Sequence, residues 1–267
     1  MNLVYYFFYW FKFYLIKKME KKDSLLKSVI IMRHGERIDC VDSKSNQLLS
    51  EYDPELTEKG IKQALDIGKQ IKKSLKDQIN TINLYSSPFT RTLMTGLNIV
   101  KKLNLKNNNI FIANGLFEVA SNNNFKYFPL NSLLINNNKN DNQKNYEEFI
   151  NKYLKKLDNF EGIKSFKEKE IEVKYPENFN DAINRYTKIA KELFDEISNN
   201  NNNSLNIIVT HGYGVQIITE YFFGKTKNKD ELLAKEDFFV DYCTSYCFNF
   251  INDKEIKFIG RIDPSFD

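Results

Sequence analysis

The sequence predicts an α/β fold with a mostly parallel sheet, and three observations carry this prediction. Two apolar runs, Ser28–Met32 and Leu205–Val209, each lead into a histidine that is followed by glycine. Such runs, without polar alternation, are typical of strands buried on both faces. Segments with helical spacing follow both runs. The chain has 267 residues, of which 42% are hydrophobic, and this suits one large α/β domain with a sizeable core.

The first strand delivers a histidine between two arginines. In Ser28–Arg37 the apolar run ends in Arg33, His34 and Gly35, and Arg37 follows shortly after. Ligands of open α/β sheets bind at the carboxyl ends of strands. Arginine's planar charged group matches phosphate oxygens, and an imidazole between two arginines is kept neutral and nucleophilic. The pattern therefore suggests attack on phosphorus, although a structural histidine is the alternative for this motif alone.

The second strand repeats the arrangement. His211 follows the run Leu205–Thr210 and precedes Gly212, and a helical run begins at Val215. The chain contains 2 histidines, and both occupy this setting. Two unrelated histidines would rarely share it by chance. We therefore expect His34 and His211 to form one site.

Four ordered segments carry a family resemblance: Arg33–Glu36, Ser86–Arg91, Gly115–Glu118 and Thr210–Gly212. They resemble the signatures of the histidine phosphatase superfamily, which has the phosphoglycerate-mutase-like fold. The resemblance runs from about Ser28 to the C-terminal hairpin. It is most similar to the branch of T-cell-receptor-suppressing tyrosine phosphatases and steroid-phosphate phosphatases. It implies a three-layer α/β/α sandwich with a mostly parallel sheet and a poorly defined insertion or cap.

The resemblance also implies a mechanism, which is metal-independent hydrolysis of phosphomonoesters without a cofactor. The residues implied to bind phosphate are Arg33, Arg37 and Arg91. Those implied to be catalytic are His34, which forms a transient phosphohistidine, His211, which stabilises the transferring group, and Glu118, which protonates the leaving alcohol. Arg37 lies past the Gly35 turn, so it could instead point to solvent.

For Arg91 and Glu118, the neighbouring residues in the sequence also suggest a function. Pro88 suits the first position of a helix, which places Arg91 one turn in, where an arginine opposes the helix dipole unless an anion is present. Glu118 lies between Phe117 and Val119, and partial desolvation there would raise its pKa toward the range of a general acid. A solvent-facing arginine and an exposed loop glutamate are the alternatives for each residue alone.

The remaining elements follow in chain order. The polar stretch Ile38–Pro54 predicts a loop over the site. Thr57 is a good N-cap for a helix with one apolar face. Further predicted elements are the strands Thr81–Ser87 and Ile110–Ile112, helices at Leu93–Leu103, Phe179–Ser198 and Val215–Phe223, and a hairpin of Tyr246–Ile251 with Glu255–Ile259.

Residues 120–180 are predicted to form an insertion or cap within a domain of residues 19–267. Asn122–Asn145 is rich in asparagine and lysine, which favours disorder or a long surface excursion. Tyr146–Leu157 has helical spacing. The mixed charges of Lys164–Lys174 indicate a solvated face. Substrate choice tends to reside in this region in the family, but the sequence here departs too far to transfer contacts.

Residues 1–18 differ from the domain. Leu3–Ile16 is apolar and aromatic apart from Lys12, too short to span a bilayer and without the features of a signal peptide. It could be an interfacial membrane anchor or a helix packed on the domain. Alternatively, translation could begin at Met19, where the composition changes abruptly.

Charge and cysteine content limit the partners and the compartment. The net charge is +4 from 39 basic and 35 acidic residues, which indicates no nucleic-acid surface. Three cysteines, Cys40, Cys243 and Cys247, argue for a reducing compartment, and we expect a cytoplasmic protein with buried, inert thiols. None has the arginine six positions on that a cysteine-based phosphatase needs.

Two other functions share this pattern. A phosphoglycerate mutase would use the same histidines, but mutases usually place a serine where Arg37 stands. A catalytically silent module that binds a phosphorylated ligand would keep the fold. The expected substrate is a phosphorylated small molecule or a phosphoprotein, and the sequence identifies neither it nor the oligomeric state.

Overall fold

The computed structural model describes residues 27–41, 53–75, 77, 79–126, 160–168, 171, 173–200, 203–235 and 239–265. The predictions for residues 1–18, for the helix at 146–157 and for most of Asn122–Asn145 lie outside these residues. No helix within the described ranges is long and apolar enough to cross a membrane.

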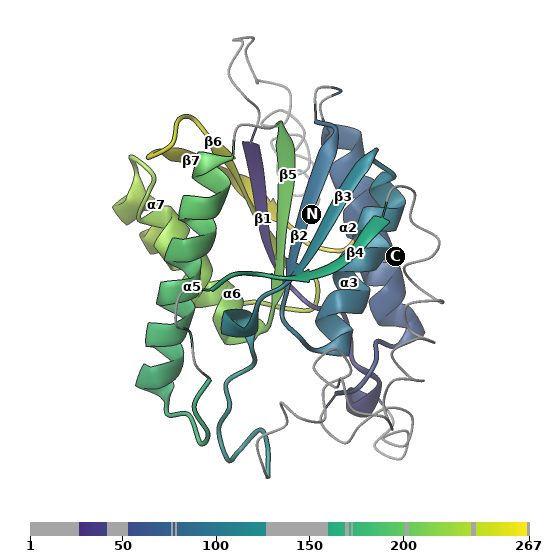
Figure 1. Ribbon diagram of the computed structural model, residues 1–267, viewed down its shortest axis with the longest axis vertical. Coiled ribbons are helices and arrows are strands. Elements are labelled where there is room, and N and C mark those ends of the chain that lie inside the picture. Colours follow the sequence, from purple (N-terminus) through teal and green to yellow (C-terminus); the bar gives the residue numbers. More distant parts are fainter. Residues whose placement is uncertain are drawn as a thin grey trace, which may run out of the picture.

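One seven-stranded mixed sheet forms the centre of the molecule, with the order β4-β3-β2-β5-β1-β6-β7 (Figure 1). Strands β1 to β5 run parallel to their neighbours among themselves, whereas β6 pairs antiparallel to both β1 and β7. The strands are β1 (Lys27–Arg33), β2 (Thr81–Ser86), β3 (Asn107–Ile112), β4 (Phe160–Ser165), β5 (Ser204–Thr210), β6 (Ser245–Phe250) and β7 (Ile256–Ile262). The predicted C-terminal hairpin is confirmed.

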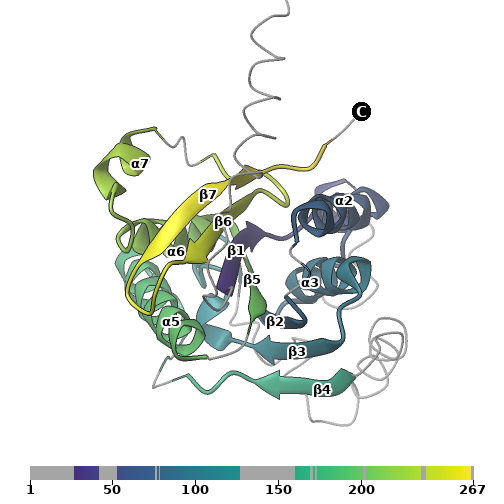
Figure 2. The same ribbon diagram turned by 90° about the horizontal axis from the view of Figure 1, so that it is seen from above.

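Helices cover both faces of this sheet, as Figure 2 shows. On one face lie α2 (Glu58–Ser74) and α3 (Thr90–Leu103), and on the other lie α5 (Phe179–Asn199) and α6 (Gly212–Phe223). The short helix α7 (Lys229–Lys235) follows α6. The predicted α/β fold with a three-layer arrangement is therefore confirmed.

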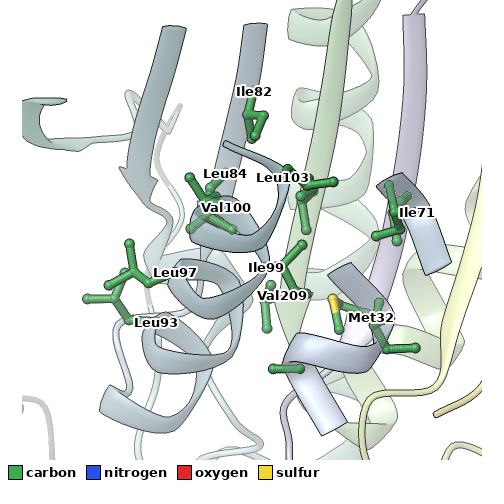
Figure 3. Packing of buried hydrophobic residues seen from close by; sticks show 14 of the residues in the cluster. Met32, Ile71, Ile82, Leu84, Leu93, Leu97, Ile99, Val100, Leu103 and Val209 are labelled. Atoms are coloured by element: carbon green, nitrogen blue, oxygen red, sulfur yellow. The ribbon is translucent and has the colours of Figure 1, made fainter. Parts of the chain in front are cut away.

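Each face of the sheet has its own hydrophobic core, and β1 contributes to both. Ile30 and Met32 belong to the core under α2 and α3, whereas Val29 and Ile31 belong to the core under α5 and α6. Figure 3 shows the first of these cores, in which Met32 and other sheet residues meet side chains of the two helices. Burial on both faces explains the unbroken apolar run of β1.

The strand register brings the two histidines to one edge of the sheet. Arg33 lies opposite Thr210 in the parallel pairing of β1 with β5, so His34 and His211 leave the sheet at the same level. A chain of amides supports this register, since Asn83 Nδ2 donates to Asn206 Oδ1 at 2.9 Å and Asn206 Nδ2 donates to the Ser28 carbonyl of β1 at 3.1 Å. A slipped register would break such buried hydrogen bonds.

Helix starts agree with the sequence in one case and differ in another. The Thr57 side chain accepts a hydrogen bond from the Gly60 N–H at 2.9 Å, so the predicted N-cap of α2 is confirmed. The prediction that Pro88 is the first residue of α3 is wrong, because α3 begins at Thr90. The Asp53 carboxylate accepts from the Thr90 N–H and hydroxyl, both at 2.7 Å, and thereby caps the helix there.

The segment Lys164–Lys174 is not simply a solvated face, as its charges had suggested. Its first residues belong to β4, which pairs in parallel with β3 at the edge of the sheet. Further on, both oxygens of Glu168 accept from the Gly115 N–H, at 3.0 and 3.1 Å. Residues 164–168 therefore continue the sheet and hold the chain near Glu118.

Candidate active site

His34 is buried at the end of β1, with 1% of its surface exposed. Its Nδ1 lies 2.7 Å from the carbonyl oxygen of Gly35. A carbonyl only accepts, so Nδ1 carries the proton and the lone pair of Nε2 is free to react. Burial, with the charge of Arg91 next, holds the pKa of His34 well below its usual value. The imidazole is therefore neutral at physiological pH.

The turn after His34 depends on two glycines that touch. A Cβ on Gly35 would lie 2.6 Å from the carbonyl oxygen of Gly60, and a Cβ on Gly60 would lie 2.4 Å from that of Glu36. The Gly35 N–H also donates to Thr95 Oγ1 at 3.0 Å. Close backbone contact thus fixes the loop after β1 against α2 and α3.

His211 is fully buried and is the residue that precedes α6. Its Nδ1 lies 3.1 Å from Glu118 Oε2, and its Nε2 lies 2.9 Å from Ser87 Oγ. A carboxylate accepts only, so we assign the proton to Nδ1, with the Ser87 hydroxyl donating to Nε2. Burial outweighs the attraction of Glu118 and lowers the pKa of His211 to about 4.

The two imidazoles face each other across the predicted site. Their ring centroids are 5.3 Å apart and their planes are inclined by 65°. The shared site expected for His34 and His211 is therefore present in the structure.

Arg91 lies beside both rings in the first turn of α3 and is 1% exposed. Its Nη2 is 3.4 Å from His211 Nδ1 and 3.8 Å from Glu118 Oε2, and its Nη1 is 4.0 Å from Asp53 Oδ1. Nε and Nη1 have no hydrogen-bond partner among the residues that the structure describes. Burial lowers the pKa of Arg91 to about 10, so the side chain stays charged at neutral pH. Its buried, unpaired donors suit an anion.

The other two arginines differ from each other. Arg33 donates from Nη1 to the Val240 carbonyl at 2.9 Å and lies 4.3 Å over the Tyr242 ring, while its buried Nε has no hydrogen-bond partner in the described part of the chain. Arg37 instead donates from Nε to Asp39 Oδ1 at 2.9 Å, in a partly buried ion pair. To bind phosphate, the Arg37 guanidinium would have to break its hydrogen bonds to Asp39 or share its N–H donors between Asp39 and phosphate.

Glu118 departs from its expected electrostatics. Its carboxylate is 17% exposed and contacts both His211 and Arg91. Burial alone would raise the pKa of Glu118, but His211 and Arg91 outweigh it and lower that pKa to about 2. The prediction of a raised pKa from flanking apolar residues is therefore wrong for the free protein, because charged residues from distant parts of the chain dominate.

The site residues could also be considered as metal ligands. His34, Glu118 and His211 offer atoms within 4.8 Å of one another. The guanidinium of Arg91, 3.8 Å from the same carboxylate, repels a cation and attracts an anion. These residues therefore fit phosphate better than a metal, and metal independence stays a prediction.

Sequence reasoning missed three residues of the site. Asp53 caps α3 and lies opposite Arg91. The only sequence feature that distinguishes Asp53 from the rest of its polar loop is its position before Pro54. Ser87 holds His211 and lies inside a motif already identified. Tyr242 lies 5.8 Å from the His34 ring, between centroids, and no local pattern marked it.

The cysteines agree only in part with the expected buried thiols. Cys243 is buried, and burial raises the pKa of its thiol. Cys247 is partly buried, and burial raises its pKa to about 12. Cys40 is exposed, with Sγ 3.2 Å from the Tyr242 hydroxyl, so the expectation is wrong for this residue.

Comparisons with known proteins give a family match over part of the chain. The histidine phosphatase superfamily (branch 1) matches residues 29–121, a range that contains three of the four motifs. A comparison with curated proteins gave no match.

Among solved structures, ecdysone phosphate phosphatase from Bombix mori in complex with tungstate is 14% identical, with a TM-score of 0.59 over 90% of this chain and 95% of that chain. A phosphoserine phosphatase from Entamoeba histolytica is 17% identical, with a TM-score of 0.46 over 88% of this chain and 96% of that chain. The first comparison confirms the fold, and the narrower resemblance to one branch stays a prediction. The sequence match over residues 29–121 makes this part of the chain similar to the histidine phosphatase superfamily, and together with the fold it supports the assignment of the chain as a phosphatase.

Proposed function

We propose that this phosphatase hydrolyses phosphomonoesters without a metal, through a phosphohistidine on His34. The observation that carries this proposal is the pair of facing imidazoles, 5.3 Å apart, beside the unpaired buried donors of Arg91. This arrangement supplies a neutral nucleophile and a positive phosphate site in one place. Arg33 adds a second, partly buried guanidinium, and Arg37 adds a third when phosphate competes with Asp39.

In the first step, His34 Nε2 attacks phosphorus in line with the leaving oxygen. The P–N bond forms as the P–O bond to the alcohol breaks, and the leaving oxygen takes a proton from Glu118. His211 donates its Nδ1 proton toward the transferring group as negative charge develops. For this His211 must exchange its bond to Glu118 Oε2, now 3.1 Å, for one to phosphate.

The proton on Glu118 has to arrive with the substrate. Glu118 is ionised in the free protein, since its pKa is about 2. Bound phosphate brings negative charge beside this carboxylate and engages Arg91, and both effects raise the pKa of Glu118. The monoanion of the substrate supplies the proton, because the second phosphate pKa is about 6.

In the second step, water releases phosphate from His34. The Glu118 carboxylate, now without its proton, accepts one from the attacking water, and a P–O bond forms. The P–N bond breaks and its electron pair returns to Nε2, which restores the neutral imidazole. Glu118 then passes this proton to the departing phosphate, which leaves as its monoanion, so Glu118 ends the cycle ionised, as it began.

The substrate is proposed to be a phosphorylated small molecule or a phosphoprotein. The free cysteines Cys40, Cys243 and Cys247 support a reducing, cytoplasmic setting.

The direct test is turnover of para-nitrophenyl phosphate by the wild type and by His34→Ala. The variant should lose activity to background while its thermal unfolding and circular dichroism match those of the wild type. Retained turnover would remove the mechanism. Incubation with phosphoglycerates separates a phosphatase, which releases phosphate, from a mutase, which moves the phosphoryl group between positions.

A further inference from the structure

The chain segment that carries Glu118 is held by side chains rather than by the sheet. After a short helix at Asn114–Leu116 it continues to residue 126 without strand pairing. Helix α5 supplies the missing hydrogen bonds through its buried Arg185, whose Nη1 donates to the carbonyl oxygens of Gly115 at 2.7 Å and Phe117 at 2.9 Å. Its Nη2 approaches the carbonyl oxygen of Glu118 at 3.4 Å.

Glu177 in turn fixes the guanidinium of Arg185. Its two oxygens accept from Arg185 Nε at 2.7 Å and Nη2 at 2.8 Å, in a bidentate pair. Glu177 and Arg185 are only 4% and 5% exposed. Glu177 also exchanges bonds with Ala120, whose N–H donates to Oε2 at 3.0 Å and whose carbonyl accepts from the Glu177 N–H at 2.8 Å. The pair thus contacts the chain on both sides of Glu118.

Other contacts also restrain the backbone just before Glu118. The N–H of Gly115 donates to Glu168, and the carbonyl of Leu116 accepts from Thr210 Oγ1 at 2.9 Å. A Cβ on Gly115 would lie 2.8 Å from the Cβ of Ile189 in α5, so only glycine allows this close approach. The backbone before Glu118 therefore has little room to shift.

The energetics indicate that the ion pair of Arg185 with Glu177 fixes the path of the backbone near Glu118 rather than adding stability. A buried ion pair is weak evidence for stability, because desolvation offsets much of the attraction between the charges. Arginine's planar group of five donors can satisfy Glu177 and several carbonyls at once, which lysine's single ammonium cannot. The result is a fixed path for the backbone, while the Glu118 carboxylate remains directed at His211 and Arg91.

We propose that Arg185 and Glu177 are positioning residues that hold Glu118 where it can protonate the leaving group. This inference rests on the proposed function, in which Glu118 is the proton donor. The pair acts through the backbone of residues 115–120 and leaves the nucleophile to be placed by the sheet. Its loss should therefore harm proton donation more than phosphoryl transfer to His34.

Leaving-group dependence tests this proposal. para-Nitrophenolate departs without a proton, whereas an alkyl alkoxide needs one, so only alkyl phosphates depend on a well-placed Glu118. For Arg185→Met and Glu177→Gln we expect kcat/KM on an alkyl phosphate to fall about 10²-fold, as for a misplacement of about 1 Å. On para-nitrophenyl phosphate kcat/KM should change less than about threefold, because this ratio reports phosphoryl transfer to His34 and excludes the later hydrolysis step, in which Glu118 acts as a base for both substrates.

Three further variants define the controls. Glu118→Gln should show the same selective loss, and adding Arg185→Met to it should cause little further loss, since both changes remove one function. Lys191→Met changes an exposed cation on the same helix and should leave both substrates unaffected. Arg185→Lys keeps the charge and the fold, and should recover only part of the alkyl activity.

The outcomes separate this inference from the proposed function. Equal losses on both substrates in the folded Arg185→Lys and Glu177→Gln proteins, or fully additive losses with Glu118→Gln, would overturn the positioning role. Loss of turnover on both substrates in His34→Ala, with selective losses in the pair, supports both proposals. A wild type that turns over neither substrate removes the proposed function and this inference with it.

Discussion

The histidines and Glu118 reach the same site from two differently supported regions. His34 and His211 follow adjacent parallel strands, and the His34 N–H donates to the Thr210 carbonyl at 3.1 Å. Glu118 lies on a loop whose carbonyls are bonded by Arg185 and Thr210. The sheet fixes the nucleophile through regular backbone pairing, whereas buried side chains fix the acid. Changes in each region should therefore affect different steps.

The largest effect outside the loop that carries Glu118, apart from loss of the nucleophile, is expected for Arg91→Ala in the first turn of α3. Removing these donors should lower kcat/KM about 10³-fold on alkyl and aryl phosphates alike, because the charge of the transferring phosphoryl group is common to both. Steady-state kinetics on the two substrates measure this. Inorganic phosphate should also stop raising the melting temperature. A loss restricted to alkyl phosphates would instead mean that Arg91 acts on proton donation by Glu118 rather than on the phosphoryl group.

The loop-supported region should respond selectively. In Glu118→Gln the amide keeps the shape but provides no transferable proton, so kcat/KM on alkyl phosphates should fall about 10²-fold or more. On para-nitrophenyl phosphate kcat/KM should change less than about threefold, since its leaving group needs no proton. Comparing kcat/KM for a series of leaving groups shows this as a steeper dependence on leaving-group pKa. An unchanged dependence would contradict the role of Glu118.

The pH profile sharpens the same contrast. Because the pKa of Glu118 is about 2 in the free protein, the proton for an alkyl leaving group must arrive with the substrate monoanion. For alkyl phosphates kcat/KM should therefore fall about tenfold per pH unit above pH of about 6, the second phosphate pKa. If kcat/KM for alkyl phosphates stayed constant between about pH 6 and about pH 8, the proton would not come from the substrate monoanion. Glu118 would then already be protonated before the substrate binds.

A smaller effect concerns stability in the sheet-supported region. The pKa values of His34 and His211 are lowered from 6.5 in the folded protein, that of His211 to about 4. The unfolded chain then binds more protons below pH 6.5, so the free energy of unfolding falls as pH decreases from 6.5 toward about 4. The slope should reach about 1.4 kcal/mol per pH unit for each neutral histidine.

Denaturant unfolding at several pH values measures this slope. His34→Ala should reduce the slope by about 1.4 kcal/mol per pH unit, since one of the two buried neutral imidazoles is gone. Burial raises the pKa of Glu168 to about 7, which opposes the histidines above pH 4.5, but this substitution does not change that contribution. Glu118, with its pKa lowered from 4.5, adds stability that is lost only below pH 4.5, so the slopes are compared between pH 6.5 and 4.5. A slope identical to that of the wild type would mean that His34 is not held neutral.

Local sequence patterns predicted the sheet-supported region well. The apolar runs of β1 and β5, the Thr57 cap and the final hairpin are each encoded within a few neighbouring residues. The pairing of His34 with His211 followed because parallel strands end at the same edge. The two-core burial of β1 is what its unbroken apolar run indicated.

The loop-supported region could not be predicted in this way. The pKa of Glu118 depends on His211 and Arg91, and the start of α3 depends on Asp53, all contacts between distant parts of the chain. The bond of Arg185 to Gly115 joins residues far apart in the sequence, and nothing local marks either partner. The charge pattern of Lys164–Lys174 likewise did not indicate that Glu168 accepts a hydrogen bond from the Gly115 N–H.

The most direct test of the account is to trap the phosphoenzyme. Wild-type protein mixed with para-nitrophenyl phosphate is quenched within the first turnover under alkaline conditions, which preserve a P–N bond, and is analysed by intact mass and peptide mapping. The account predicts one phosphoryl group on His34 and none in His34→Ala. A phosphoryl group on another residue, or full turnover by His34→Ala, would contradict it.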